Sequence, residues 1–225
     1  MPNSYSRRAV GTLFSLLALC GCENVSDPSD FEQQASLGLP PTLNCRGVVG
    51  GGVVGNVEVK RGEDCILTDV IVRGSVKVLE GATLTLIGGT VRGNVEGDKA
   101  FTVAVRGTKV DGNVQIQESR FARITDATIG GSIQVQKTSN PGDGVVIVGG
   151  NAVAGNIQIE DNFVLTLEVS GNLVLGNLQV VKNVGGGGKL VAGNQVAQNL
   201  QCGENSTPFI AVDNSAGERE GQCMQ

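Results

Sequence analysis

The chain has 225 residues and a formal net charge of −5, and it contains no His and no Trp. The absence of His excludes Ser-His-Asp and Cys-His catalytic sites and removes the usual general base at neutral pH. An acidic chain without a basic patch is a poor binder of nucleic acid, so we expect no nucleic-acid partner.

Residues 1–21 have the features of a lipoprotein signal peptide. Two arginines, Arg7 and Arg8, precede an apolar run that is too short to span a bilayer. The sequence Leu19-Cys20-Gly21-Cys22 that follows resembles the lipobox of bacterial lipoproteins, with Leu at −3, a small residue at −1 and Cys at +1. This resemblance predicts lipidation at Cys22 and attachment to a membrane. An ordinary cleaved signal peptide is the alternative.

Residues 22–41 are polar and contain three Pro, which predicts a flexible tether with a reach of about 25 Å. A folded cap is the alternative. The expected location is therefore outside the cytoplasm, in the cell envelope. If the source is Gram-negative, Glu23 next to the lipid site favours the outer membrane or the cell surface.

A tripeptide of Gly, Asn or Ser, and an aliphatic residue recurs through residues 42–225 at steps of 19 to 24 residues. A period of this length is typical of one turn of a solenoid. The repeat occurs at Gly55-Asn56-Val57, Gly74-Ser75-Val76, Gly93-Asn94-Val95, Gly112-Asn113-Val114, Gly131-Ser132-Ile133, Gly155-Asn156-Ile157, Gly176-Asn177-Leu178 and, with Gln replacing Gly, Gln198-Asn199-Leu200.

The positions after each repeat alternate between apolar and polar residues, which is the pattern of a strand with one buried face. Two further short apolar segments follow in each period. We therefore predict an all-β fold, a single-stranded right-handed parallel β-helix with about 7–8 coils. Left-handed hexapeptide helices differ, because their coils keep a multiple of six residues. We expect the Gly-Asn pairs to form corners in left-handed backbone conformations, with Asn side chains bonded along the axis.

The outward position of each repeat forms one polar column. It contains Glu58, Lys77, Glu96, Gln115, Gln134, Gln158, Gln179 and Gln201. Such a column supports strand register, and as an alternative it offers a flat face to a glycan or a protein. The acidic residues Asp64, Asp69, Asp98, Asp111, Asp126 and Asp161 share no column, so we interpret them as turn and solvated residues. We predict no catalytic residue, no metal and no cofactor.

Two further features concern the packing and the surface. Phe101, Phe121 and Phe163 occupy similar positions in their periods, which predicts an internal aromatic stack. The longest period contains an insertion at residues 138–145. Because solenoids often bind partners through such insertions, we predict a contact loop there. Its expected contact residues are Thr138, Ser139, Asn140 and Asp143.

Four cysteines follow the lipobox, and each lies about one coil from its nearest neighbour. Residues one coil apart lie on adjacent strands about 5 Å apart, within reach of a disulfide. This spacing predicts the pairs Cys45–Cys65 and Cys202–Cys223, one at each end of the rod. Export makes oxidation reasonable.

The repeats and the C-terminal sequence resemble a group of bacterial secreted or lipid-anchored parallel β-helix proteins of unassigned function. Those proteins share Gly-Asn-Val-x-Val coils and a Gly-Asn-Leu-Gln-Cys … Gly-Gln-Cys ending. Here the ending is Gln198-Asn199-Leu200-Gln201-Cys202 and Gly221-Gln222-Cys223. The resemblance covers roughly residues 45–225 and implies the fold and export, but no activity.

Three functions agree with these features. The first is a non-enzymatic surface or envelope lipoprotein that acts as a rigid display or interaction module, as a monomer with an envelope protein or glycan as partner. The second is a self-assembling structural polymer that resembles bactofilins. The third is a polysaccharide-binding or polysaccharide-degrading β-helix, which would need a clustered charged groove that the repeat does not supply.

Overall fold

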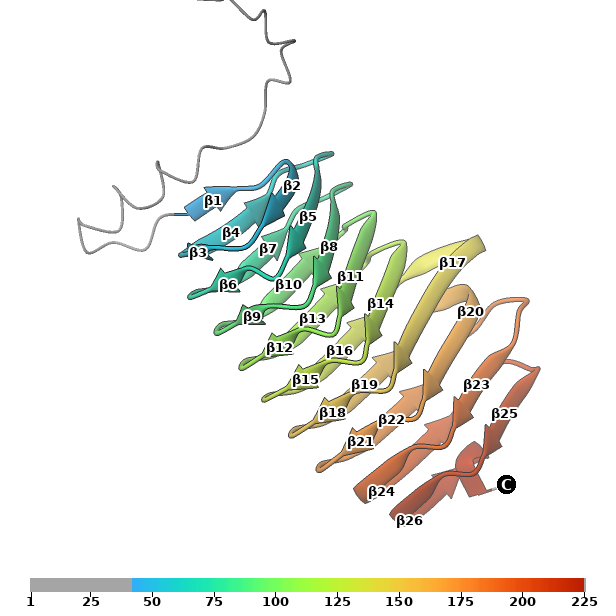
Figure 1. The fold of residues 1–225 in the computed structure, drawn as a ribbon. Helices are drawn as coiled ribbons and strands as arrows, with labels where there is room; N and C mark the ends of the chain where they lie inside the picture. The colour runs from blue at the N-terminus through green and yellow to red at the C-terminus, as the bar shows by residue number, and fades with distance from the viewer. Residues whose placement is uncertain (1–41, 225) are drawn as a thin grey trace, which may run out of the picture.

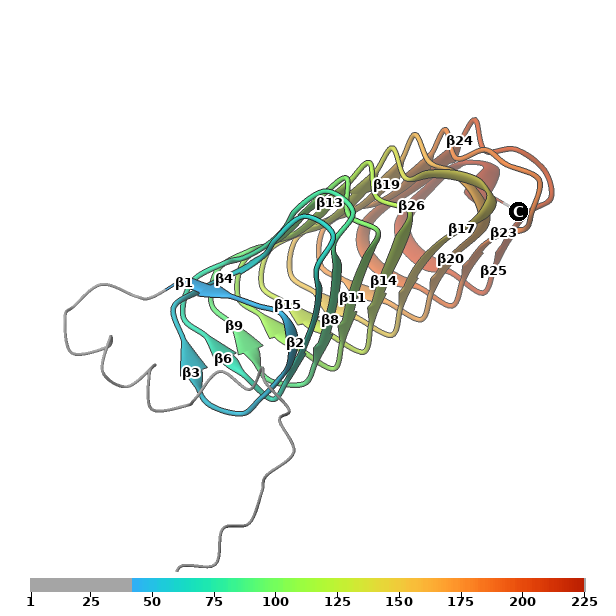
Figure 2. The ribbon, with the colours of Figure 1, turned by 90° about the horizontal axis from the view of Figure 1, so that it is seen from above.

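The computed structural model describes residues 42–224 as a right-handed parallel β-helix of about nine turns (Figure 1). In the view from the N-terminal end, the chain runs clockwise away from the viewer, from β1 through β2 and β3 to β4 (Figure 2). The predicted fold is confirmed, with slightly more turns than expected. The extra turns lie at the two ends, where the Gly-Asn repeat is absent or altered.

The strands of each turn lie on three faces of the rod, and neighbouring turns pair in parallel. The first face contains β1 (Thr42–Asn44), β4 (Asn56–Val59), β7 (Val76–Val78), β10 (Val95–Asp98), β13 (Val114–Gln117), β16 (Ile133–Gln136), β19 (Ile157–Glu160) and β22 (Leu178–Val181). The second contains β2 (Gly47–Gly50), β5 (Asp64–Thr68), β8 (Thr83–Ile87), β11 (Thr102–Arg106), β14 (Phe121–Thr125), β17 (Ser139–Gly149), β20 (Phe163–Ser170), β23 (Lys189–Ala192) and β25 (Phe209–Val212). The third contains β3 (Val53–Val54), β6 (Ile71–Val72), β9 (Thr90–Val91), β12 (Lys109–Val110), β15 (Thr128–Ile129), β18 (Ala152–Val153) and β21 (Leu173–Val174). Two longer strands, β24 (Gln195–Gly203) and β26 (Ser215–Gly221), run from the third face onto the first, and the 3₁₀ helix η1 (Gln222–Met224) follows.

Aliphatic side chains fill the interior in columns along the axis. One column, from the third residue of each repeat, consists of Val57, Val76, Val95, Val114, Ile133, Ile157, Leu178 and Leu200, all of them buried. The register places each of these residues beside its counterpart in the next turn, as in the pair Val95 and Val114. Burial of each large aliphatic side chain contributes about 1.5–3 kcal/mol, so the columns supply the main stabilisation.

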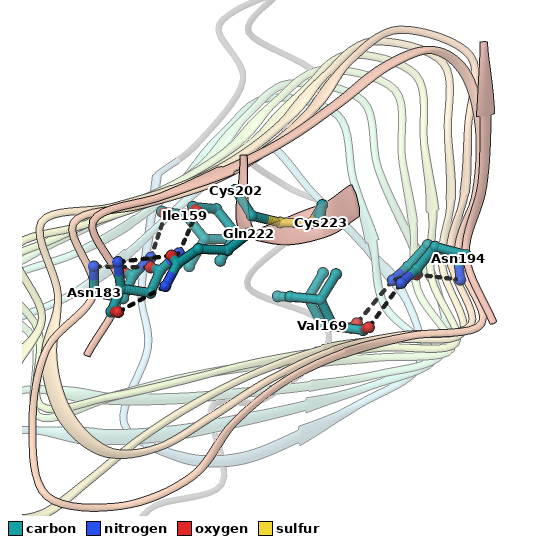
Figure 3. Close-up of a disulfide and its surroundings, with 11 residues drawn as sticks. Ile159, Val169, Asn183, Asn194, Cys202, Gln222 and Cys223 are labelled. Atoms are coloured by element: carbon teal, nitrogen blue, oxygen red, sulfur yellow. Dashed lines mark hydrogen bonds between the residues drawn. A yellow bond between two sulfur atoms is a disulfide. The ribbon is translucent and has the colours of Figure 1, made fainter. Parts of the chain in front are cut away.

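Both predicted disulfides are present, one at each end of the rod. Cys45 is bonded to Cys65 and Cys202 to Cys223, with Cα–Cα distances of 5.6 Å and 5.1 Å. At the C-terminal end, η1 turns inward and brings Cys223 against Cys202 (Figure 3). The last turn is therefore tied to η1 by a covalent bond.

The Gly-Asn corners differ from the sequence prediction, because their glycines do not have positive φ. Each glycine instead allows close approach between turns. A Cβ at Gly112 would lie 2.4 Å from Oδ1 of Asn94 and 2.6 Å from the carbonyl oxygen of Gly93. The predicted bonding of Asn along the axis is confirmed, since the Asn113 N–H donates to Asn94 Oδ1 at 2.9 Å. Space for the side chain of the previous turn is thus what requires glycine here.

Left-handed backbone occurs at the other two corners, both in glycines, such as Gly88 and Gly150, and in nine residues of other types. These residues are Asp69, Lys99, Glu118, Asp126, Lys137, Asp161, Lys182, Glu204 and Asp213, with φ between 52° and 56°. Three of the acidic residues that we interpreted as turn residues, Asp69, Asp126 and Asp161, therefore have that role. The residue after each left-handed position points toward the interior.

In the C-terminal half, two ladders of buried asparagines occupy these inward corner positions. One consists of Asn151, Asn172 and Asn194 and continues to the partly exposed Asn214; the other consists of Asn162, Asn183 and Asn205 and ends at Gln222. Figure 3 shows the two ladders on opposite sides of the interior. Each amide bonds to the turns on both sides. The Asn183 Nδ2, for example, donates to the Ile159 carbonyl at 2.9 Å and to Asn205 Oδ1 at 2.9 Å. The ladders satisfy backbone groups that wider corners would leave unpaired.

Among the described residues, Lys189 is the one charged side chain that is buried. It occupies an inward position of β23, beside Leu167 and Phe209 in register. Its Nζ donates to the carbonyl oxygens of Gly185 at 2.7 Å and Gly187 at 2.8 Å. Burial lowers the pKa of Lys189, because desolvation disfavours the ammonium form. The side chain therefore acts as an internal tie for the glycine run before β23.

Candidate interaction surface

The outward side of the first face presents a continuous row of polar side chains, here called the polar ladder. It runs through Glu58, Lys77, Glu96, Gln115, Gln134, Gln158, Gln179, Gln201 and Glu220, each in register with the next. The strand β26 adds Glu220 to the column predicted from the sequence. All nine side chains are exposed or half-buried. The predicted column is therefore a real surface feature that extends along most of the rod.

Hydrogen bonds link the glutamines at the C-terminal end of the polar ladder. Gln158 Nε2 donates to Gln179 Oε1 at 3.2 Å, and Gln179 Nε2 donates to Gln201 Oε1 at 3.0 Å. Each of these amides keeps a further N–H group free to donate outward. In the described part of the chain, no ion pair joins Lys77 to Glu58 or Glu96. Opposite charges therefore lie beside one another in register without a direct ion pair.

Two open hollows lie on this same face. One is lined by Lys77, Glu96, Gln115, Gln134 and their neighbours, and the other by Asn177, Gln179, Asn199, Gln201 and Glu220. The walls of the second hollow are mainly polar, whereas those of the first expose more apolar than polar area. Amide and carboxylate groups line both hollows, so the face suits a partner that offers hydrogen-bonding groups.

The other faces are different in character. The large apolar side chains with substantial exposure include Val48, Ile66, Ile87, Ile210 and Val212 on the second face and Val53, Ile71 and Leu173 on the third. None of those with substantial exposure belongs to a first-face strand of the described chain. The polar ladder is thus a property of one face and not of the whole surface.

The inserted segment forms a bulge in β17, which projects beyond the neighbouring strands (Figure 1). Its Asp143 forms an ion pair with Arg120, whose guanidinium lies 5.2 Å from the ring centroid of Phe101 and 5.4 Å from that of Phe121. Thr138 is buried and is not available to a partner, so its assignment as a contact residue is wrong. Ser139 and Asp143 are exposed, and the side chain of Asn140 lies outside the described part.

The prediction of an internal phenylalanine stack is wrong. Phe101 and Phe163 are 44% and 42% exposed, and Phe121 is half-buried on the outward side of β14. Phe101 and Phe121 form an edge-to-face pair with centroids 5.5 Å apart. These phenylalanines follow the repeat glycine by eight or nine residues, which is one position away from the inward-facing column. Small residues such as Ala100 occupy the inward position.

The part of the chain that the structure describes contains no group of three or more His, Cys, Asp or Glu side chains that could hold a metal ion. Within residues 42–224, no helix has the length and apolar character needed to cross a membrane. Cys22, the predicted lipid site, and the tether at 22–41 lie outside the described residues.

Sequence reasoning missed the two interior asparagine ladders. A signal was present, because Asn follows Gly150, Gly171, Gly193 and Asp213 in one series and Asp161, Lys182 and Glu204 in the other. Both series recur at 20 to 22 residues, the period of the coil.

Comparison of the chain with protein-family models, with curated proteins and with solved structures found no match. The function is therefore inferred from the surface and from the chemistry of the residues that form it.

Proposed function

We propose that this protein is a non-enzymatic surface or envelope lipoprotein whose β-helix acts as a rigid interaction module. The observation that carries the proposal is the polar ladder, an unbroken row of nine polar side chains on one face of a rod that is closed by disulfides. A rigid, repetitive surface loses little conformational entropy on binding, which favours recognition of an extended partner.

The chemistry of the face favours binding over catalysis. Glu220 lies among amides, Glu96 and Asp98 share a hollow with Lys77 and several glutamines, and no His is available as a proton carrier. The expected partner is an envelope protein or a glycan that presents hydrogen-bonding groups along its length.

Membrane attachment through Cys22 has its own test. The change Cys22→Ala should move the protein from the membrane fraction to a soluble or unprocessed form, because the acyl chains supply the attachment. Detergent-phase partitioning measures this, with Cys20→Ala as the matched control that should remain in the membrane fraction. Unchanged partitioning of Cys22→Ala would contradict the assigned lipid site.

Site-specific photocrosslinking in intact cells tests the interaction module. A benzophenone amino acid replaces Gln134 on the polar ladder or, as a control, Thr85 on the outward side of β8. We expect a discrete adduct from position 134 only, and its loss when Gln115→Lys and Gln158→Lys are added. The same products from both positions, or no adduct from either, would contradict a role for this face.

A further inference from the structure

Exposed apolar residues lie around the N-terminal end of the rod, and others lie among residues 163–224. In β2, Val48 is 66% exposed and lies beside Ile66 of β5. In β3, Val53 is 44% exposed and lies beside Ile71 of β6. We call these four side chains the apolar rim. Val48 and Val53 flank the corner Gly50-Gly51-Gly52, which carries no side chains, and Ile66 and Ile71 flank the next corner, where the exposed Asp69 lies between them. The rim therefore surrounds two adjacent corners.

The charges near the apolar rim differ from those at the other end of the rod. Arg73 is exposed two positions after Ile71, and Arg92 occupies the equivalent position one turn later. Neither arginine forms an ion pair with a described residue. Residues 42–100 contain seven basic and seven acidic residues, whereas residues 150–224 contain three basic and seven acidic residues. An anionic surface therefore repels the C-terminal end more strongly than the N-terminal end.

We propose that the apolar rim docks onto a lipid surface, with Arg73 and Arg92 beside anionic headgroups. The position of the remaining chain supports this occupant, because residues 22–41 connect Cys22 directly to β1 in the first turn. This step rests on the proposed lipid anchor. A tether of about 20 residues keeps the rim at a local concentration of about millimolar near the lipid, so that a weak contact suffices.

Docking through the apolar rim gives the rod a defined orientation. The first turn lies on the lipid surface, and the closed C-terminal turn with Cys202 and Cys223 lies farthest from it. The polar ladder then extends away from the membrane and remains accessible along its length. The exposed apolar residues at the far end, such as Ile210 beside Leu190, stay in water.

A tryptophan reporter tests this proposal cleanly, because the chain contains no Trp. The reporter changes are Val48→Trp in β2 and Ile210→Trp in β25, two exposed outward positions on the first and last strands of the same face. The chain from residue 22 is coupled through Cys22, its one cysteine outside the disulfides, to maleimide lipid in vesicles of phosphatidylcholine and phosphatidylglycerol. Chemical coupling makes the result independent of lipidation in the cell.

Brominated acyl chains should quench the reporter at position 48 about twofold and that at position 210 by less than about a tenth, because the rim would enter the headgroup and acyl boundary. Adding Arg73→Glu and Arg92→Glu should remove about half of the quenching at position 48. Equal quenching at both positions, or none at position 48, would overturn the proposal. A blue shift at position 48 that increases with protein density but not with brominated lipid would instead identify a second copy as the occupant. A negative quenching result would count against docking of the rim but not against the lipid anchor. Fractionation of Cys22→Ala tests the anchor separately.

Discussion

The change Val114→Asp should destabilise the rod by about 4 kcal/mol or more, because it places an unpaired carboxylate in a fully buried column. Val114 lies between Val95 and Ile133, so no polar partner is near along the axis. Urea unfolding at pH 7 measures the loss. Stability of this variant should rise as the pH falls, because burial raises the pKa of the new carboxyl and protonation removes the charge.

The matched control is Gln134→Asp on the polar ladder, which introduces the same group on the outward side of the adjacent strand. We expect a change within about 1 kcal/mol, as is usual for surface positions. Equal losses in the two variants would show that the inward and outward assignments are wrong.

Asn172→Leu should have the second largest effect, about 3–5 kcal/mol, because it removes four hydrogen bonds from a buried ladder. Asn172 Oδ1 accepts from the N–H and the amide of Asn151, and Asn172 Nδ2 donates to Val148 and Asn194. Leu has the same branched skeleton of four side-chain heavy atoms and is not smaller than Asn, so the change leaves no cavity and the unsatisfied polar groups dominate the loss. Unfolding in urea, with exchange of the Asn151 amide proton, measures it.

Asn177→Ser is the control for the ladder experiment. Asn177 lies at the outward Gly-Asn corner, where Ser75 and Ser132 already accept the same backbone hydrogen bond in other turns. We expect a loss within about 1 kcal/mol. A loss of stability as large as that of Asn172→Leu would contradict this account. It would mean that the burial of the interior asparagines does not explain their importance.

The fold could be predicted because each turn repeats the same local pattern. Alternation around Val57, Val76 and their counterparts specifies which side of each first-face strand is buried, and the period specifies how turns stack. The cysteine spacing then implies the disulfides, since residues one turn apart are neighbours. The polar ladder follows from the same register.

Features that depend on contact between turns were harder to predict. The corner glycines were assigned to left-handed backbone, although Gly112 is required by the approach of Asn94 from the previous turn. Several of the left-handed positions hold residues such as Lys99 and Glu118, which propensity does not indicate. Phe101 was predicted to lie inside from its distance in sequence to the repeat glycine. That distance does not show which side of the second-face strand a residue faces. The partner of the polar ladder depends on chemistry outside the chain.

Closure of the rod separates an interaction module from a self-assembling polymer. Open strand edges favour end-to-end stacking. At the C-terminal end, η1 packs against β24, β25 and β26 and is bonded to β24 through Cys223, which obstructs the approach of a second rod to the edges of β25 and β26. Sedimentation velocity of the oxidised, non-lipidated chain from residue 22, with Cys22→Ser, across a wide range of protein and salt concentrations is the most direct test. We predict one species of monomer mass throughout. Filaments, or growth with concentration while both disulfides remain intact, would contradict the interaction module and favour the polymer.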